Sequence, residues 1–192
     1  MPAKLPKPEF HPLTPDRWQD FETLFGERGA CGGCWCMAWR LTSKQFDEQK
    51  GAPNKKAMKA IVARGDQPGV LAYVDGKAVG WCSVAPREVF VRLESSRVLK
   101  PIDEQPVWSI SCFFIAKEHR RQGLSVKLLK AAIDFVRRQG GKIVEGYPNE
   151  PKKDQPDVFM WTGLAASFVK AGFKEAARRS SRPIFRHELK QA

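Results

Sequence analysis

Three groups of residues in the 192-residue sequence could do chemistry. One is a basic, glycine-containing segment at 120–126, one is a cysteine-rich segment at 31–40, and one is the pair Glu145 and Tyr147 in an apolar stretch. These groups suggest anion binding, thiol or metal chemistry, and proton transfer, respectively. Whether any of them can act depends on the helices and strands that carry it.

The segment 120–126 is expected to form an anion site at the start of a helix. A helix N-terminus offers unpaired backbone N–H groups and the positive end of the helix dipole. Gly123 would let a phosphate approach the backbone because it has no Cβ, Arg120 and Arg121 add positive charge, and Ser125 adds a hydroxyl donor. Neither the nucleotide loop GxxxxGK[ST] nor the dinucleotide fingerprint GxGxxG occurs in the chain, so the site belongs to neither class.

The sequence around this turn predicts a buried strand, an amphipathic helix and a second strand. Residues 107–115 form an apolar run of strand length, typical of a central strand that is covered on both faces. Residues 123–139 carry apolar side chains on one helical face and charged side chains on the other. Residues 142–147 again suit a strand. This order predicts a right-handed parallel crossover.

The rest of the chain predicts one α/β domain over 10–192, after a flexible tail at 1–9. Periodicity and turn residues indicate a strand at 10–13, helices from Thr14 and at 54–64, a β-hairpin at 69–74 and 77–84, a helix at 161–170, and strands at 173–179 and 183–188. The segments 27–53 and 86–106 show no such pattern and are expected to be irregular or mixed.

Composition narrows the class of protein. The 42% hydrophobic and 28% charged residues are typical of a globular protein. No apolar run is long enough to cross a bilayer, and the first residues lack an apolar signal core, so we expect a cytoplasmic protein with no membrane partner. The net charge of +12 favours anionic partners, but the basic residues are scattered and no nucleic-acid motif is present, so nucleic-acid binding is not predicted.

Two motifs resemble the GNAT superfamily of N-acetyltransferases. Arg120-x-x-Gly123-x-Ser125 is similar to the family signature [Q/R]xxGx[G/A], with Ser in place of the final small residue. Residues 167–173 (SFVKAGF) resemble the LYxKxGF helix end that precedes the last two strands. The resemblance covers residues 10–188. It implies the GNAT fold: a mixed, mostly antiparallel twisted sheet with one parallel crossover, flanked by about four helices.

The resemblance also implies acetyl-CoA as the cosubstrate. In this family the pyrophosphate sits on the backbone amides of the turn, and the pantetheine arm pairs with the preceding strand, where a backbone N–H polarises the thioester. The corresponding residues of this chain are Phe113, Phe114, Ile115, Arg120, Arg121, Gln122, Gly123, Leu124, Ser125 and Val126. The acceptor amine would meet the acetyl group where the strands 107–115 and 142–147 part.

The catalytic residues are less well marked. Family members commonly place a tyrosine in the LYxKxGF helix to protonate the leaving thiolate, but this chain has Phe168 there. Tyr147 is the candidate substitute, and a core-edge tyrosine with a solvated hydroxyl is the alternative. Glu145 is the candidate base, and a carboxylate on an exposed stretch of strand is the alternative.

The cysteine-rich segment has several interpretations. Cys31, Cys34 and Cys36 could supply three thiolates to zinc, but no nearby residue completes four ligands and no metal is predicted. Buried thiols beside Trp35 and Trp39, forming a wall of the acceptor pocket, are the favoured interpretation. Arg40 could contact an acidic group on the acceptor or form a surface ion pair.

Together these features predict transfer of an acetyl group from acetyl-CoA to a primary amine of a small-molecule or peptide acceptor. The alternative is a CoA-binding sensor or regulatory protein without catalysis, suggested by the missing tyrosine at position 168. Both functions, acetyl transfer and CoA sensing, are compatible with a homodimer. The sequence does not identify the acceptor.

Overall fold

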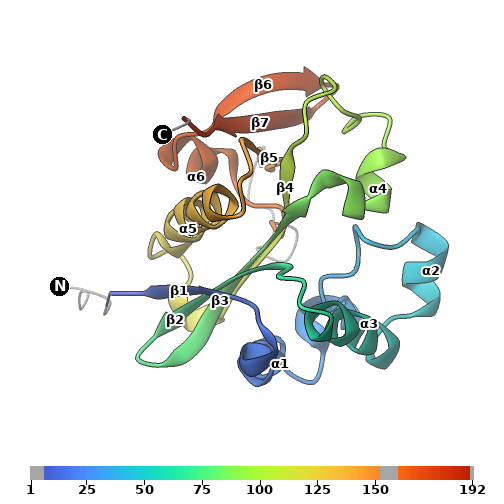
Figure 1. Ribbon diagram of the computed structural model, residues 1–192, viewed down its shortest axis with the longest axis vertical. Coiled ribbons are helices and arrows are strands. Elements are labelled where there is room, and N and C mark those ends of the chain that lie inside the picture. Colours follow the sequence, from blue (N-terminus) through green and yellow to red (C-terminus); the bar gives the residue numbers. More distant parts are fainter. Residues whose placement is uncertain (1–6, 152–159, 191–192) are drawn as a thin grey trace.

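The computed structural model describes residues 7–151 and 160–190, which form one seven-stranded sheet with helices on both faces (Figure 1). The strand order is β1-β2-β3-β4-β5-β7-β6. All neighbouring strands are antiparallel except β4 and β5, which are parallel. The strands are β1 (Glu9–Pro12), β2 (Gly69–Val74), β3 (Lys77–Pro86), β4 (Trp108–Ile115), β5 (Ile143–Gly146), β6 (Lys174–Arg179) and β7 (Arg182–Glu188). The predicted mixed sheet with a parallel crossover is confirmed.

Helices of different length connect these strands. The α-helices of the described residues are α1 (Trp18–Phe25), α2 (Ser43–Glu48), α3 (Ala52–Ala63), α4 (Val91–Glu94), α5 (Leu124–Arg138) and α6 (Ala165–Lys170). Short 3-10 turns precede α1, α4 and α5, at Pro15–Arg17, Arg87–Val89 and Lys117–His119. None of the helices in these ranges is long and apolar enough to cross a membrane.

The sheet separates two cores, which follow from the alternation of side chains along each strand. In β2, Val70 packs with the α5 side of the sheet, and the next residue, Leu71, packs with the α1 and α3 side. Helix α5 covers the first face with residues such as Leu128, and α1 covers the second with Phe21. Figure 1 shows α5 and α6 on one side of the sheet and α1 and α3 on the other.

The strands β4 and β5 part along their length. They are paired from Trp108↔Val144 to Ile110↔Gly146, and β4 continues to Ile115 paired with β3 but no longer with β5. Close to the same point the register between β3 and β4 shifts, which leaves Ser111 as an extra residue of β4. The sheet therefore opens next to Ile110, between two neighbouring strands.

A short backbone segment, Trp161 to Leu164, lies in this opening. The Phe113 N–H donates to the Trp161 carbonyl at 2.6 Å, and Asn149 forms a parallel bridge with Leu164. Gly163 has a φ of +86° and lies so close to the Phe113 ring that a Cβ would approach it to 3.1 Å. Only glycine fits this turn, and the turn occupies part of the β4 edge.

The structure corrects several predicted bounds. The helix predicted at 161–170 begins only at Ala165, because the turn around Gly163 pairs with Asn149 instead. β1 begins at Glu9, so the last residue of the predicted tail is part of the sheet, while residues 1–6 lie outside the described residues. Two short helices, α2 and α4, occupy segments that were expected to be irregular or mixed.

Candidate active site

The turn before α5 has the backbone conformation of an anion site. Arg121 and Gly123 both adopt left-handed conformations, with φ of +58° and +77°. The first N–H with an acceptor within the helix is that of Lys127, which donates to Gly123 O at 3.3 Å. The N–H groups of the first three helical residues, which precede Lys127, therefore have no acceptor within the helix and point out of its start, as the predicted anion site requires.

Open space lies beside this turn. A Cβ built at Gly123 meets no atom within 4 Å. The positive φ explains why glycine occupies the position, since side chains of L-residues rarely adopt it. The backbone of the turn is therefore not covered by other protein atoms on the side where a Cβ would project.

The charged side chains of the turn differ in how they are held. The Arg120 Nε donates to the Ile115 carbonyl at 2.9 Å, which ties this guanidinium to the end of β4. Arg121 is exposed. The positive charge predicted for the turn is therefore present on two sides of it, one fixed against the sheet and one on the surface.

The remaining residues of the turn mostly serve the fold. Leu124 is buried and Val126 packs against the core on the α5 side of the sheet. The Gln122 Nε2 donates to a backbone carbonyl in the preceding 3-10 turn at 2.7 Å. The Ser125 and Ser167 hydroxyls lie 3.2 Å apart, which joins the start of α5 to α6. The Ser125 hydroxyl thus already has a partner in the protein.

The three predicted strand residues lie on alternating sides of β4. Phe113 faces α6, and its ring centroid is 6.1 Å from that of Phe168 in an edge-to-face contact. Phe114 faces the opposite core and packs against Phe25 at 5.4 Å. Ile115 contributes its carbonyl to Arg120. Their side chains build both cores, so any contact with a coenzyme would use the backbone edge.

Phe168, which replaces the tyrosine of the family motif, is fully buried. Its ring lies among Phe113, Phe173 and Phe185, and a Cβ at Gly146 would collide with it. The ring thus covers the point where β4 and β5 part. No proton donor is available from this position.

Glu145 and Tyr147 form one buried network. Glu145 is 1% exposed and Tyr147 is fully buried, so the alternatives of an exposed carboxylate and of a solvated hydroxyl are both wrong. The Tyr147 hydroxyl lies 2.7 Å from Glu145 Oε1, 2.7 Å from Arg87 Nη1 and 2.8 Å from Ser109 Oγ. The structure brings together the two residues that the sequence singled out.

Hydrogen-bond chemistry fixes the direction of this network. Arg87 can only donate and an ionised Glu145 can only accept, so the Tyr147 hydroxyl accepts from Arg87 and donates to Glu145. The remaining lone pair of Tyr147 then receives the hydroxyl of Ser109. Burial and the Glu145 charge raise the pKa of Tyr147, which keeps its phenol protonated at neutral pH.

Arg87 was not identified from the sequence. It donates from Nη1 to Glu145 at 3.2 Å, from Nε to Glu94 at 2.8 Å, and from Nη2 to the carbonyls of Leu93 and Leu99. Its contacts join the α4 segment to β5. No local pattern marks such an arginine, because its partners lie up to 60 residues away.

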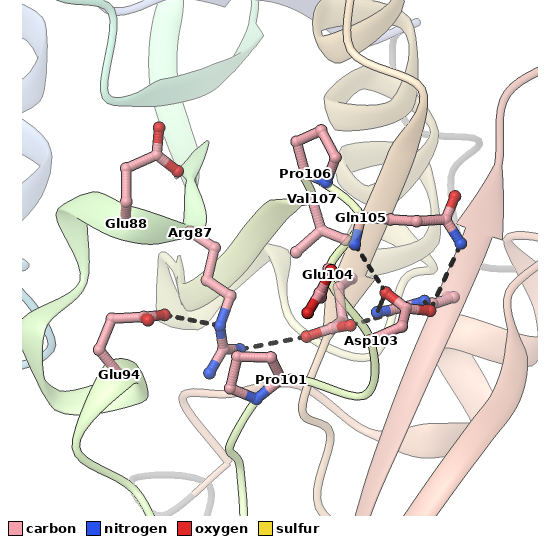
Figure 2. A pocket seen from close by; sticks show the side chains of 11 residues that line it. Arg87, Glu88, Glu94, Pro101, Asp103, Glu104, Gln105, Pro106 and Val107 are labelled. Atoms are coloured by element: carbon pink, nitrogen blue, oxygen red, sulfur yellow. Dashed lines mark hydrogen bonds and ion pairs between the residues drawn. The ribbon is translucent and has the colours of Figure 1, made fainter.

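A cavity of about 210 Å³ opens beside this network (Figure 2). Arg87, Asp103 and Glu104 are among its lining residues, and Figure 2 shows Arg87 reaching towards Glu94. Arg186 binds Glu145 Oε2 at 2.7 Å and also binds Asp103, so Glu145 is held between two arginines. The carboxylate of Glu145 forms part of the cavity wall.

The cysteine segment lies on the opposite face of the sheet from α5. Cys31 is exposed, Cys34 is half-buried and Cys36 is buried. The Trp81 Nε1 donates to the Cys36 Sγ at 3.1 Å. Within the described ranges no group of three His, Cys, Asp or Glu side chains is placed to hold a metal ion. The prediction of buried thiols is therefore confirmed for Cys36 and wrong for Cys31, and the tryptophan that binds Cys36 is Trp81 instead of Trp35 or Trp39.

Arg40 forms no ion pair in the described part of the chain, so the expected surface ion pair is absent there. Its guanidinium carbon lies 4.9 Å from the centroid of the Phe90 ring, and its Nε and Nη2 atoms are buried without a hydrogen-bond partner. The Nε and Nη2 edge of the guanidinium is thus buried, while the residue as a whole is half-buried.

Comparison with known proteins identifies the class that this fold and site define. Residues 35–152 match the sequence profile of the acetyltransferase (GNAT) family. No curated protein sequence matches the chain. The chain belongs to the GNAT acetyltransferase family.

Solved structures of low sequence identity share the fold. PaiA N-acetyltransferase from Thermoplasma acidophilum, in complex with coenzyme A, has 13% identity and a TM-score of 0.53, covering 95% of this chain and 99% of its own. A GNAT family acetyltransferase from Listeria monocytogenes has 10% identity and a TM-score of 0.60, covering 96% of both chains. One from Streptococcus agalactiae has 14% identity and a TM-score of 0.57, covering 97% and 98%.

Proposed function

We propose that this protein transfers an acetyl group from acetyl-CoA to a primary amine of a small-molecule or peptide acceptor. The observation that carries the proposal is the turn before α5. It directly follows β4, it contains left-handed Arg121 and Gly123, and it is open beside Gly123. Such a turn can take a phosphate group, and family membership makes the pyrophosphate of coenzyme A the natural candidate.

The donor would be held by backbone more than by side chains. The N–H groups at the start of α5 would bind the pyrophosphate, with Arg120 and Arg121 adding positive charge. The pantetheine arm would run along the backbone edge of β4 at Phe113 and Ile115. Acetyl-CoA supplies the activated thioester, and the protein orients it where β4 and β5 part.

The protein must also move protons, because the amine attacks in its neutral form and the thiolate leaves as an anion. Tyr147 immediately follows the last paired residue of β5, next to the parting, and its hydroxyl is protonated at neutral pH. We assign Tyr147 as a proton relay: it passes its hydroxyl proton to Glu145 as it takes up the amine proton through Ser109, and the reverse movement along the same chain delivers a proton to the departing thiolate. Ser109, which donates to Tyr147, extends this chain towards β4.

A CoA-binding sensor without catalysis is the second candidate function. Two observations favour it: Phe168 fills the place of the usual acid, and the Phe113 N–H, a natural donor to a thioester carbonyl, is bonded to Trp161. A sensor needs the turn but does not need Tyr147 or Glu145.

Calorimetric titration with acetyl-CoA, followed by measurement of thiol release with a panel of amines, tests both candidates. We expect binding and turnover for the wild type, and loss of binding for Gly123→Glu, whose carboxylate would occupy the open space and repel phosphate. Binding without turnover on any amine would favour the sensor. Absence of binding by the wild type would overturn both.

A further inference from the structure

The loop that follows the cysteines carries buried hydrogen-bond donors without acceptors. The Nε and Nη2 atoms of Arg40 and the Nε1 atom of Trp39 are buried, and none of them has a hydrogen-bond partner in the described part of the chain. The two arginine atoms are neighbours and form one edge of the guanidinium group. This edge is the fork that binds the two oxygens of a carboxylate in parallel.

An unpaired buried cation is costly, so this arrangement calls for an explanation. Burial lowers the pKa of the Arg40 guanidinium, and the charges of Cys36 and Asp66 offset only part of this effect. The Phe90 ring, 4.9 Å from the guanidinium carbon, covers one face and supplies a cation–π contact. That contact leaves the fork edge unused, because the ring faces the plane of the group.

The loop is next to the proposed reaction centre. The Trp39 ring centroid is 5.7 Å from that of Trp161, and the Trp161 carbonyl accepts from Phe113 of β4. Trp39 and Phe90 also belong to the same apolar cluster as Tyr147. A group bound at Arg40 would therefore lie on the same side of the sheet as the Tyr147 network.

The thiol of Cys36 is the internal alternative to an external anion. Burial raises the pKa of this thiol, but the Cys112 thiol, the Trp81 N–H and the charge of Arg40 outweigh it and hold that pKa below its ordinary value. No hydrogen bond joins Cys36 to Arg40 in the residues described. A Cys36 thiolate could neutralise Arg40 at a distance, but it would leave the fork edge unpaired.

We propose that Arg40 binds a carboxylate of the acceptor through its Nε and Nη2 atoms, so that the acceptor is an amino acid or another amine that carries a carboxylate. This inference rests on the proposed acetyl transfer. A carboxylate matches both the single charge and the planar edge of the guanidinium. Because the fold has already desolvated this cation, pairing it gains more than pairing a surface arginine.

Paired acceptors that differ only in the carboxylate test the proposal. The probes are 5-aminopentanoate with pentylamine, lysine with cadaverine, and the remaining common amino acids with their decarboxylated amines. For the best pair we expect kcat/KM at least tenfold higher for the carboxylated member. Arg40→Gln should lower this preference at least tenfold, chiefly by raising KM for the carboxylated member of each pair. Equal kcat/KM within every pair in the wild type would overturn the proposal.

Two control variants separate binding from general effects of charge and of the thiol. Arg64→Gln removes the same charge from an exposed arginine that pairs with Asp66, and it should keep the preference. Cys36→Ala should also retain the preference for the carboxylated acceptor. Loss of that preference in this variant would show that the preference depends on the Cys36 thiolate, which would contradict the proposal. Arg40→Met should have the same melting temperature as the wild type or a higher one, because it removes a buried cation that has no partner. A lower melting temperature would indicate that the cation has a partner within the protein, which would contradict the proposal.

A binding measurement keeps this inference separate from the proposed function. If no amine is acetylated, acetyl transfer fails, and the same amino acids are titrated into the protein by calorimetry with coenzyme A present. Binding that Arg40→Gln abolishes and Arg64→Gln retains supports the carboxylate site without catalysis. No binding by any amino acid, or equal binding by Arg40→Gln, overturns it.

Discussion

The backbone N–H of Phe113 is bonded to the carbonyl of Trp161 at 2.6 Å, so the edge of β4 is already paired where a pantetheine arm would add to it. Addition of an extended ligand to a strand needs free main-chain groups. On the proposed function, acetyl-CoA binding along β4 would compete with the turn that carries Trp161, and we expect this competition to lower the affinity.

Trp161→Gly is expected to strengthen acetyl-CoA binding several-fold. The substitution removes the ring contact with Trp39 and loosens the turn that occupies β4. Calorimetric titration measures the change. Val98→Gly, which alters a side chain with the same 37% exposure, is the matched control and should not change the affinity. Weaker binding by Trp161→Gly would show that the turn supports the donor.

Tyr147→Phe should lower kcat by about 10², the lower end of what a positioned proton donor contributes. It should also reduce stability by about 1–3 kcal/mol, because Arg87 and Ser109 lose a buried partner. Rates of thiol release and urea unfolding measure the two effects. The other tyrosine supplies the control: Tyr73 donates to Asp20 at 2.7 Å, and Tyr73→Phe should leave kcat unchanged. Equal effects on kcat would refute the role of Tyr147.

Arg87→Met should destabilise the protein by about 3–5 kcal/mol, as removal of one member of a buried ion pair does. The variant leaves the buried Glu145 with only Arg186 and frees the carbonyls of Leu93 and Leu99. Urea unfolding gives the magnitude. Arg92→Met is the control: it removes an arginine of α4 that binds Ser43 on the surface. We expect it to lower the free energy of unfolding by less than Arg87→Met does. Similar losses in both variants would contradict a central role for Arg87.

The free energy of unfolding should fall in acid partly through Asp103. Hydrogen bonds from Arg186 lower the pKa of this carboxyl below its ordinary value of 3.8. A group with a lowered pKa in the folded state stabilises the fold above its unfolded pKa, and this contribution is lost as the pH falls through the folded value. Asp103→Asn should therefore make stability less dependent on pH below about pH 4, the unfolded range of an aspartate. Chemical unfolding between pH 2 and 6 measures this, and an unchanged dependence would contradict it.

Local patterns in the sequence predicted the strand and the helix on either side of the turn at Gly123, but they did not predict the long-range contacts. The hairpin around Asp75-Gly76 and the helix over Leu124–Arg138 have strong periodicity, and both were found. The α2 helix was missed although Thr42 and Gln45 form a capping box, a signal that the sequence does contain.

Other features could not be inferred from local sequence. Glu145 and Tyr147 stood out as polar groups in an apolar stretch of sequence. Nothing in the neighbouring sequence indicates that Arg87 binds both of them or that Arg186 binds Glu145. Such partners depend on how the sheet is assembled. The unpaired fork of Arg40 is likewise visible only when the packing of Phe90 is known.

The sheet also has a consequence for the order of events. The start of α5, next to the turn at Gly123, packs on the α5 side of the sheet through Leu124, while Tyr147 and Trp39, the neighbour of Arg40, belong to the cluster on the other side. On the proposed function, the donor would approach from the α5 side and the acceptor from the other side, and they would meet where β4 and β5 part, so neither would block the path of the other. We therefore expect both to be bound at once, with either one able to arrive first, and neither product to trap the other.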